Sequence, residues 1–162
     1  MQAANRCPMT ITLESPDQPD VIALIEALDA YQDTLYPPEA RYALDLTALC
    51  QPHVLFAVAR DQDGVAQGCA AVVLAPAYGE IKRMFVVPSA RGTGLARQIL
   101  DALEREAMAR GCTALMLETG PAQPDAIAFY GRQGFLRCGP FGDYPDHPLS
   151  VFMAKALGKA PS

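Results

Sequence analysis

A glycine-rich turn stands between a strand-like run and a helix-like run near the middle of the chain. The turn spans Ser89–Ala96 (SARGTGLA), and Pro88 separates it from a β-prone run over residues 80–87. From Leu95 onward, apolar residues recur at helical spacing. Free backbone N–H groups and the positive end of the helix dipole therefore converge on the turn, where small residues let an anion approach the backbone. This arrangement predicts a site for a phosphate-bearing cofactor.

The spacing of the glycines decides between the known phosphate motifs. A Rossmann fingerprint needs a third glycine where this chain has Arg97, and no G-x-x-x-x-G-K-S/T sequence occurs, which excludes a P-loop. What remains is Arg91-x-x-Gly94-x-Ala96. It resembles the R/Q-x-x-G-x-G/A motif of the GCN5-related N-acetyltransferase (GNAT) superfamily, whose loop amides hold the pyrophosphate of acetyl-CoA. The alternative is that the glycines only form a tight turn between a strand and a helix.

The resemblance extends beyond the turn. Residues 125–135 (DAIAFYGRQGF) resemble the second signature of the family, a helix that carries a tyrosine and ends in Gly-Phe, and residues 114–120 have the composition of a buried strand. The match covers residues 53–138 well, in the order strand, helix, strand, helix. The segments 140–145 and 149–155 resemble a bacterial subgroup of the family whose substrate is unassigned.

The resemblance implies an acetyl-CoA-dependent N-acetyltransferase. A primary amine, from a small molecule or a protein, would attack the thioester directly in a ternary complex. The reaction needs a held cofactor, a neutral amine and a proton for the departing thiolate. Two alternatives stay open, namely a non-catalytic acetyl-CoA-binding regulatory module and a scaffold that uses the fold without a cofactor.

The family also implies which residues contact acetyl-CoA, the expected co-substrate. The strand that ends at residue 87 would pair with the pantetheine arm, the turn amides would hold the pyrophosphate, and Gln123 stands where many members carry Asn. The expected cofactor-binding residues are Met84, Phe85, Val86, Arg91, Gly92, Thr93, Gly94, Leu95, Ala96, Arg97, Gln123 and Tyr130.

Two residues are expected to move protons. Glu80 has the spacing of the general-base glutamate in histone-acetylating members, and Tyr130 stands where the family tyrosine protonates the thiolate. In a regularly alternating strand, Glu80, Lys82 and Met84 would share one face. Glu80 could instead be a paired strand-end residue, Glu118 is a rival carboxylate, and Tyr130 could simply pack against the cofactor.

The sequence says less about which residues bind the acceptor. Family geometry points to the residues around Pro37-Pro38 and to the late loop, because loops carry specificity. The expected substrate-binding residues are Tyr36, Glu118, Asp143 and Tyr144, with Tyr31, Glu39, Asp146 and His147 as further candidates.

Composition limits the class of protein. The 162 residues are 51% apolar with a net charge of −5, which suits one domain over residues 10–158, with tails at 1–9 and 159–162. The basic residues form no dense cluster, so nucleic acid and membranes are not expected partners. There is no long apolar run and no signal pattern, so a cytoplasmic location is expected. The two histidines and the five cysteines are scattered, so no metal is expected. A homodimer stays open.

The periodicity predicts the element order β-α-α-β-β-β-α-β-α-β-β, and the resemblance to the GNAT superfamily implies an α/β (α+β) fold with a mixed, mostly antiparallel central sheet and helices on both faces. A first strand is expected at Ile11–Leu13, a helix from Asp20 to about Thr34, and a second short helix over 39–50. Strands are expected over 54–59 and 65–74, joined by a turn at residues 61–64.

Overall fold

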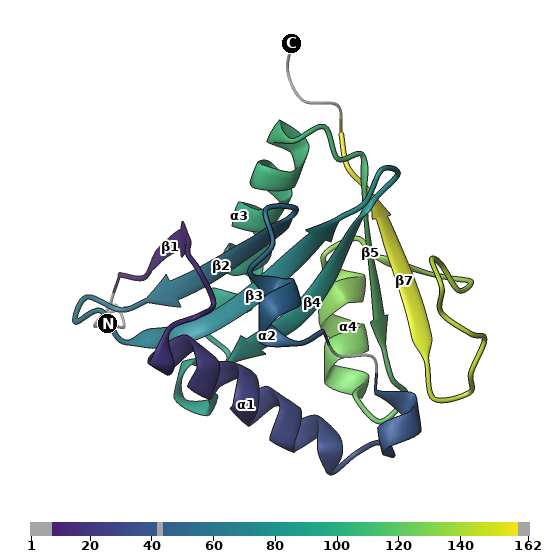
Figure 1. The fold of residues 1–162 in the computed structure, drawn as a ribbon, viewed down its shortest axis with the longest axis horizontal. Coiled ribbons are helices and arrows are strands. Elements are labelled where there is room, and N and C mark those ends of the chain that lie inside the picture. Colours follow the sequence, from purple (N-terminus) through teal and green to yellow (C-terminus); the bar gives the residue numbers. More distant parts are fainter. Residues whose placement is uncertain (1–7, 42–43, 159–162) are drawn as a thin grey trace, which may run out of the picture.

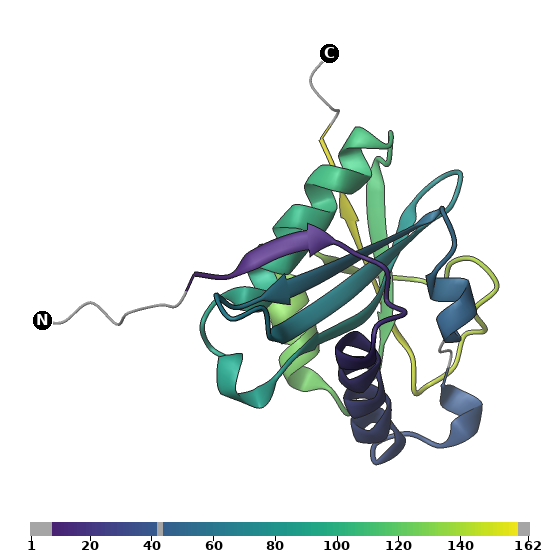
Figure 2. The same cartoon turned by 60° about the vertical axis from the view of Figure 1, so that its left-hand side comes forward.

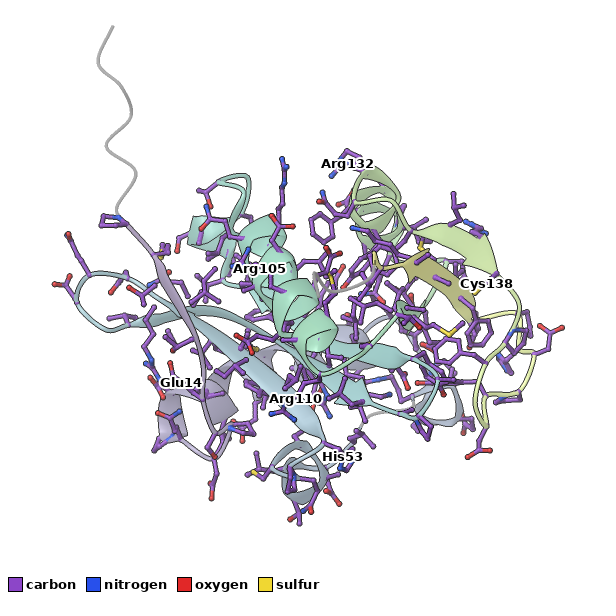
Figure 3. The ribbon with its side chains drawn as sticks, turned by 90° about the horizontal axis from the view of Figure 1, so that it is seen from above. Glu14, His53, Arg105, Arg110, Arg132 and Cys138 are labelled. Carbon is purple, nitrogen blue, oxygen red and sulfur yellow. The ribbon has the colours of Figure 1, made fainter. Side chains whose placement is uncertain are left out.

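The computed structural model describes residues 8–41 and 44–158. Its central feature is a seven-stranded sheet with the strand order β1-β2-β3-β4-β5-β7-β6. The strands are β1 (Thr10–Leu13), β2 (Val54–Arg60), β3 (Ala66–Leu74), β4 (Gly79–Val86), β5 (Ala114–Thr119), β6 (Leu136–Cys138) and β7 (Val151–Ala156). Only β4 and β5 pair in parallel; the other neighbours are antiparallel. The predicted fold class is confirmed. The two edges of the sheet are marked in Figure 3 by Glu14, just after β1, and by Cys138 in β6.

Helices cover both faces of the sheet, as predicted (Figures 1 and 2). They are α1 (Pro19–Asp33), η1 (Pro38–Ala40), α2 (Leu46–Leu49), η2 (Pro88–Ala90), α3 (Leu95–Ala109) and α4 (Pro124–Arg132). The prediction of one helix over 39–50 was wrong, because the described part of that stretch holds only η1 and α2. Asp45 accepts a hydrogen bond from the Ala48 N–H at 2.8 Å and thereby begins a separate short helix.

Two apolar clusters lie on opposite faces of the sheet. On the α3 side, Ile99 and Leu103 pack against Ala57 and Leu115, all buried. On the α1 side, Leu24 and other α1 residues pack against Phe56, Val58 and Phe85. Neighbouring residues of β2 thus alternate between the clusters, as period 2 requires. Figure 2 shows α1 and α3 separated by the strands.

The sequence predicted tails at residues 1–9 and 159–162. Residues 1–7 and 159–162 lie outside the described residues. Met9, which was expected to belong to the first tail, packs against the α3-side cluster. Within the described ranges, no helix is long and apolar enough to cross a membrane.

Strand β4 contains a bulge at the point where the site begins. Cys69 pairs with Phe85 and Ala71 with Lys82, so Ala70 faces two residues, Arg83 and Met84. Arg83 has a positive φ of 60°. The extra residue shifts the alternation, as a β-bulge does.

The bulge overturns one expectation about the faces of β4. Ile81 belongs to the α3-side cluster, so Glu80 and Lys82 point to the opposite face. Met84 comes after the inserted residue and packs against the α3-side cluster. Glu80 and Lys82 therefore share a face, but Met84 does not share it with them.

Beyond the bulge, β4 separates from β5. The two strands pair only where Gly79–Ile81 meets Leu115–Leu117, while β5 stays paired with β7 along its whole length. Figure 1 shows β4 and β5 diverging, with α4 behind them. The second half of β4 therefore has one edge without a strand partner.

Candidate active site

A cavity of about 410 Å³ opens where β4 leaves β5. Its lining comes from both faces of the sheet. Arg91, Ala96 and Tyr130 line it on the α3–α4 side, and Tyr36 and Tyr144 line it on the opposite side. The cavity therefore joins the two faces through the gap between the strands. We call its two parts the cofactor half, toward α3 and α4, and the acceptor half, toward α1 and Tyr144.

The turn before α3, which we call the anion cradle after its predicted role, borders the cofactor half of the cavity through Arg91 and Ala96, while Gly92, Thr93, Gly94, Leu95 and Arg97 are not among the lining residues. The backbone N–H groups from Gly92 to Arg97 donate to no backbone acceptor among the described residues. Gly92 and Gly94 have φ values of 77° and 85°, and a Cβ at either position would meet no atom. Both glycines are therefore needed for the backbone conformation and not for space. The free N–H groups stand at the positive end of a 15-residue helix.

The two arginines of the turn differ. The Nε of Arg91 donates to the Val86 carbonyl oxygen at 3.0 Å, and its guanidinium carbon lies 5.6 Å from the centre of the Phe85 ring. Arg91 lines the cavity. Arg97 is 70% exposed and lies 3.8 Å from the Asp101 carboxylate. Only Arg91 is held beside the cradle.

The remaining expected cofactor contacts divide in the same way. Met84, Phe85, Val86, Ala96 and Gln123 line the cavity with Arg91 and Tyr130. The side chains of Thr93 and Leu95 contribute to the fold. Thr93 Oγ1 donates a hydrogen bond to the Ala90 carbonyl at 2.6 Å, and Leu95 is buried in the core. At Thr93 and Leu95, only the backbone N–H group is therefore left for binding an anion.

Tyr130 lies on α4 in the wall of the cavity and is only 6% exposed. Its ring meets Phe129 and Phe135 edge to face, with centroid distances of 5.1 and 5.4 Å. Burial raises the pKa of the Tyr130 hydroxyl well above its usual range. The hydroxyl therefore keeps its proton at neutral pH and can donate it in a hydrogen bond.

Glu80 belongs to a tight polar group with Lys82 and Tyr144. Its Oε2 lies 3.1 Å from the Lys82 Nζ and accepts a hydrogen bond from the Tyr144 hydroxyl at 2.5 Å. The Lys82 Nζ also donates to the Tyr144 oxygen at 2.9 Å. Burial and the Glu80 carboxylate raise the pKa of Tyr144. The Glu80 carboxylate thus already has an ammonium group and a hydroxyl as partners.

Glu118 lies near the end of β5 in a different environment. Burial raises the pKa of its carboxyl to about 7, although the charges of Lys82 and Arg41 act in the opposite direction. Ser150 Oγ donates to it at 3.5 Å. Glu118 lines the cavity and exchanges its proton close to neutral pH. Such a carboxyl is suited to accept a proton in a reaction.

Tyr36 places an unpartnered hydroxyl in the acceptor half. The side chain is buried, lines the cavity, and its hydroxyl oxygen has no hydrogen-bond partner among the described residues. The ring packs on the Gly120 backbone, where a Cβ would collide with the hydroxyl oxygen. Burial raises the pKa of Tyr36, with the nearby Ala122 N–H acting in the opposite direction. The Tyr36 hydroxyl can therefore still hydrogen-bond a ligand or a water molecule in the cavity.

The other acceptor candidates are distributed unevenly. Tyr31 and Tyr144 line the cavity, while Glu39, Asp143, Asp146 and His147 are not among its lining residues. His147 Nδ1 accepts the Leu149 N–H at 3.0 Å, which is a local loop contact.

Sequence reasoning missed Arg41 and Arg83, which also line the acceptor half. Arg41 pairs with Asp29 and Asp33, and Arg83 donates to Asp29 at 2.6 Å and to the Leu44 carbonyl at 2.6 Å. No motif surrounds either arginine, so the sequence carries no signal for them. In residues 8–41 and 44–158, no cluster of His, Cys, Asp and Glu could hold a metal ion.

Comparisons with known proteins agree on one family. The Acetyltransferase (GNAT) family profile matches residues 23–135. The chain is 49% identical to the "IAA acetyltransferase" of Azospirillum brasilense, covering 92% of this chain and 98% of that one. It is 36% identical to the N-acetyltransferase YsnE of Bacillus subtilis, over 92% and 100%. A Klebsiella pneumoniae structure described as an acyl-CoA N-acyltransferase superposes with a TM-score of 0.79 at 41% identity, covering 93% and 98%. The chain belongs to the GNAT family of acetyltransferases.

Proposed function

We propose that this acetyltransferase moves the acetyl group of acetyl-CoA to a primary amine by direct attack in a ternary complex. The observation that carries the proposal is the cavity lined from both faces of the sheet at the divergence of β4 and β5. A cofactor that enters from the cofactor half and an amine that enters from the acceptor half would meet in this gap. An aminoglycoside 6'-N-acetyltransferase solved with coenzyme A has the same fold, with a TM-score of 0.70.

The cofactor half offers contacts along the whole length of acetyl-CoA. The unpaired edge of β4 at Met84–Val86 would hydrogen-bond the pantetheine arm as a neighbouring strand would. The N–H groups from Gly92 to Arg97 would bind the pyrophosphate, and Arg91 would add positive charge. Gln123 precedes α4 and its side chain does not cap the helix; its Oε1 accepts a hydrogen bond from Thr119 Oγ1 at 3.4 Å, and its amide NH2 group would contact the cofactor.

Transfer requires that the amine lose a proton. In the proposed reaction the amine nitrogen bonds to the thioester carbon and the carbon–sulfur bond breaks. The proton passes from nitrogen to Glu118, directly or through a water molecule. Glu118 suits this role because it lines the cavity and its pKa lies at about 7. Glu80 is less suitable, since Lys82 and Tyr144 already engage its carboxylate.

Tyr130 would meet the departing thiolate. Its raised pKa keeps the hydroxyl protonated, which favours donation of a hydrogen bond to the sulfur. The sulfur can then take a proton from the tyrosine or from solvent.

The names of relatives do not select one acceptor. Proteins that share this fold include an aminoglycoside 6'-N-acetyltransferase and a ribosomal-protein-S18-alanine N-acetyltransferase, both at 20% identity or less. The more similar Azospirillum protein is named for IAA. The acceptor must therefore be argued from the cavity of this chain.

A panel of primary amines tests the proposal. The purified protein is incubated with acetyl-CoA and each amine, and free CoA thiol and acetylated product are measured together. Release of thiol with a matching acetylamine is the expected result. Acetyl-CoA binding without transfer to any amine would instead support the regulatory module.

The pH profile of kcat/KM then tests the base, with Glu80→Gln as the matched control for Glu118→Gln. We expect Glu118→Gln to lower the rate by about 10²–10⁴-fold at pH 7. The loss should shrink at higher pH, where the amine deprotonates unaided. Glu80→Gln should keep the wild-type shape. A Glu118→Gln profile that superimposes on wild type rules out this role.

A further inference from the structure

Cationic side chains line the acceptor half of the cavity, although the chain carries a net charge of −5. Arg41, Lys82 and Arg83 are lining residues. Asp29 and Asp33, which pair with the arginines, are not. Arg41 and Arg83 therefore border the cavity with their aspartate partners behind them, whereas Lys82 lines it together with its own partner, Glu80.

Arg41 and Arg83 share one carboxylate oxygen. Asp29 Oδ1 lies 2.6 Å from an Nη atom of Arg83 and 3.4 Å from an Nη atom of Arg41. The second carboxylate partner of Arg41, Asp33, is 69% exposed, so water and salt screen this pair. The two guanidinium groups thus share one aspartate, and the carboxylates that line the acceptor half with them are Glu80, which is paired with Lys82, and Glu118.

Arg41 is held in place yet keeps hydrogen-bonding capacity. One Nη atom donates to Asp33 and to the Asp29 carbonyl, and the other Nη atom contacts Asp29 Oδ1. The Nε–H donates to no described residue. The side chain is only 13% exposed. A positioned guanidinium with remaining N–H groups is the group that proteins use to bind a carboxylate.

The same half of the cavity holds acceptors suited to an amine. Glu118 lines it within reach of the Arg41 charge, which lowers the pKa of Glu118 against the larger effect of burial. The Tyr36 hydroxyl lies nearby without a hydrogen-bond partner among the described residues. An amine N–H would satisfy this oxygen and face the Glu118 carboxyl.

On the basis of the proposed acetyl transfer, we propose that the acceptor is an amine that also carries a carboxylate, as a free amino acid does. Its amine lies beside Glu118 and Tyr36, and its carboxylate binds Arg41. Leu28, Tyr31 and Leu149 also line the cavity and provide contacts for an apolar side group. Peptide lysines, polyamines and other amines without a neighbouring carboxylate would leave Arg41 without its ligand.

Matched pairs of acceptors measure how much the carboxylate of the acceptor contributes to kcat/KM. Phenylalanine is compared with phenethylamine, tryptophan with tryptamine and leucine with isoamylamine, each at several pH values so that rates refer to the neutral amine. We expect kcat/KM to be about 10–100-fold higher for the amino acid of each pair, since a charge-assisted bond to the carboxylate is gained. Equal or lower values for the amino acids overturn the proposal and leave acetyl transfer to amines standing.

Variants at Arg41 test whether this residue causes the preference for acceptors with a carboxylate. Arg41→Gln should abolish the preference, measured within the variant as the ratio of kcat/KM for the amino acid to kcat/KM for its matched amine. Arg110→Gln, which removes the same charge from the exposed end of α3, should keep the preference. An unchanged preference in Arg41→Gln overturns the assignment. If this variant does not fold, Arg41→Lys keeps the charge, removes the two-pronged contact and should still reduce the preference.

A binding measurement separates this inference from the proposed function. In the presence of saturating CoA, the amino acid should raise the melting temperature of the wild-type protein, and the amine without a carboxylate should raise it less. Acetylation of simple amines together with no stabilisation by any amino acid contradicts the acceptor class alone. Failure to acetylate any amine contradicts the proposed function itself.

Discussion

Glu118 holds its proton up to near-neutral pH because burial penalises its charged form. The pKa is raised from 4.5 to about 7, so between these values the folded protein binds more protons than the unfolded chain. Stability should therefore decrease as pH rises through this window. We expect Glu118→Gln to be more stable than wild type at pH 8, by about 1–2 kcal/mol after allowance for partial solvation, and similar to it at pH 4. Urea unfolding across pH 4–9 measures this difference. A variant that is less stable at pH 8 would show that the ionised carboxylate is satisfied by contacts.

Tyr36 carries a buried hydroxyl that folding leaves without a hydrogen bond to any described residue. Tyr36→Phe should therefore change the free energy of unfolding by less than about 1 kcal/mol. It should nevertheless lower kcat/KM for the acceptor by about tenfold, with the KM for acetyl-CoA unchanged. Tyr31→Phe is the control, because Tyr31 lines the same cavity but is 52% exposed. Full activity of Tyr36→Phe would remove the hydroxyl from the acceptor site.

The turn before α3 is predicted to bind the pyrophosphate of acetyl-CoA through its backbone N–H groups. Gly94→Glu puts a negative side chain where the pyrophosphate is expected, and it also strains the backbone, because Gly94 has a positive φ of 85°. Wild type at a ligand concentration of about 100 Kd should gain about 5–10 °C in Tm with acetyl-CoA, and Gly94→Glu should gain almost nothing.

The matched control is Gly64→Glu in the β2–β3 turn. Gly64 also has a positive φ, 79°, and a Cβ added there would likewise meet no atom, so the backbone strain and the added charge are the same. This variant should keep the full Tm gain with acetyl-CoA. An equal loss in both variants would mean that strain, and not the anion cradle, explains the effect.

An ion-pair group joins β2, α1 and the residue after β1 at the β1 edge of the sheet. Arg60 lies 2.9 Å from Glu14 and 2.6 Å from Asp20, and the Arg60 guanidinium lowers the pKa of Glu14 to about 2. A lowered pKa contributes stability above the usual value of 4.5 that is lost as pH falls toward 2. Glu14→Gln should cost about 1–2 kcal/mol at pH 7 and nothing near pH 2. Thermal unfolding against pH tests this, and a constant difference would contradict the linkage.

At the scale of the whole molecule, the cavity reaches both faces of the sheet, toward α3 and α4 on one and toward α1 on the other. In the proposed ternary complex both substrates are bound at once, and acetyl transfer would need no acetylated enzyme. We expect initial-rate plots at varied acetyl-CoA and amine to give intersecting lines. Parallel lines, together with release of CoA in the absence of amine, would indicate a covalent acetyl-enzyme and contradict direct attack.

Much of the fold was predictable because its signals are local. The apolar spacing of Leu95, Ile99 and Leu103 indicated α3, and the β-prone runs of β2 and β3 indicated strands on either side of a turn. Glycines at 92 and 94 indicated a turn at the start of a helix, and in the structure both have positive φ in the turn that precedes α3. The helix expected over 39–50 was wrong, since no short-range pattern told one helix from two short pieces.

The site depended on contacts that no local pattern contains. The bulge at Arg83 turned Met84 away from Glu80, and it arises from the pairing of β4 with β3. Glu118 and Glu80 look alike in the sequence, yet Glu80 contacts Lys82 and Tyr144, whereas Glu118 is half-buried and its carboxyl hydrogen-bonds only to Ser150 among the described residues. Arg41 reaches the cavity because α1 packs against β3 and β4 and the loop after α1 places Tyr36 on Gly120, just after β5. Periodicity determines which segments become helices and strands, because it acts between residues a few positions apart. The charge, exposure and partners of a side chain are set by neighbours that are distant in sequence, and only the tertiary structure brings these together.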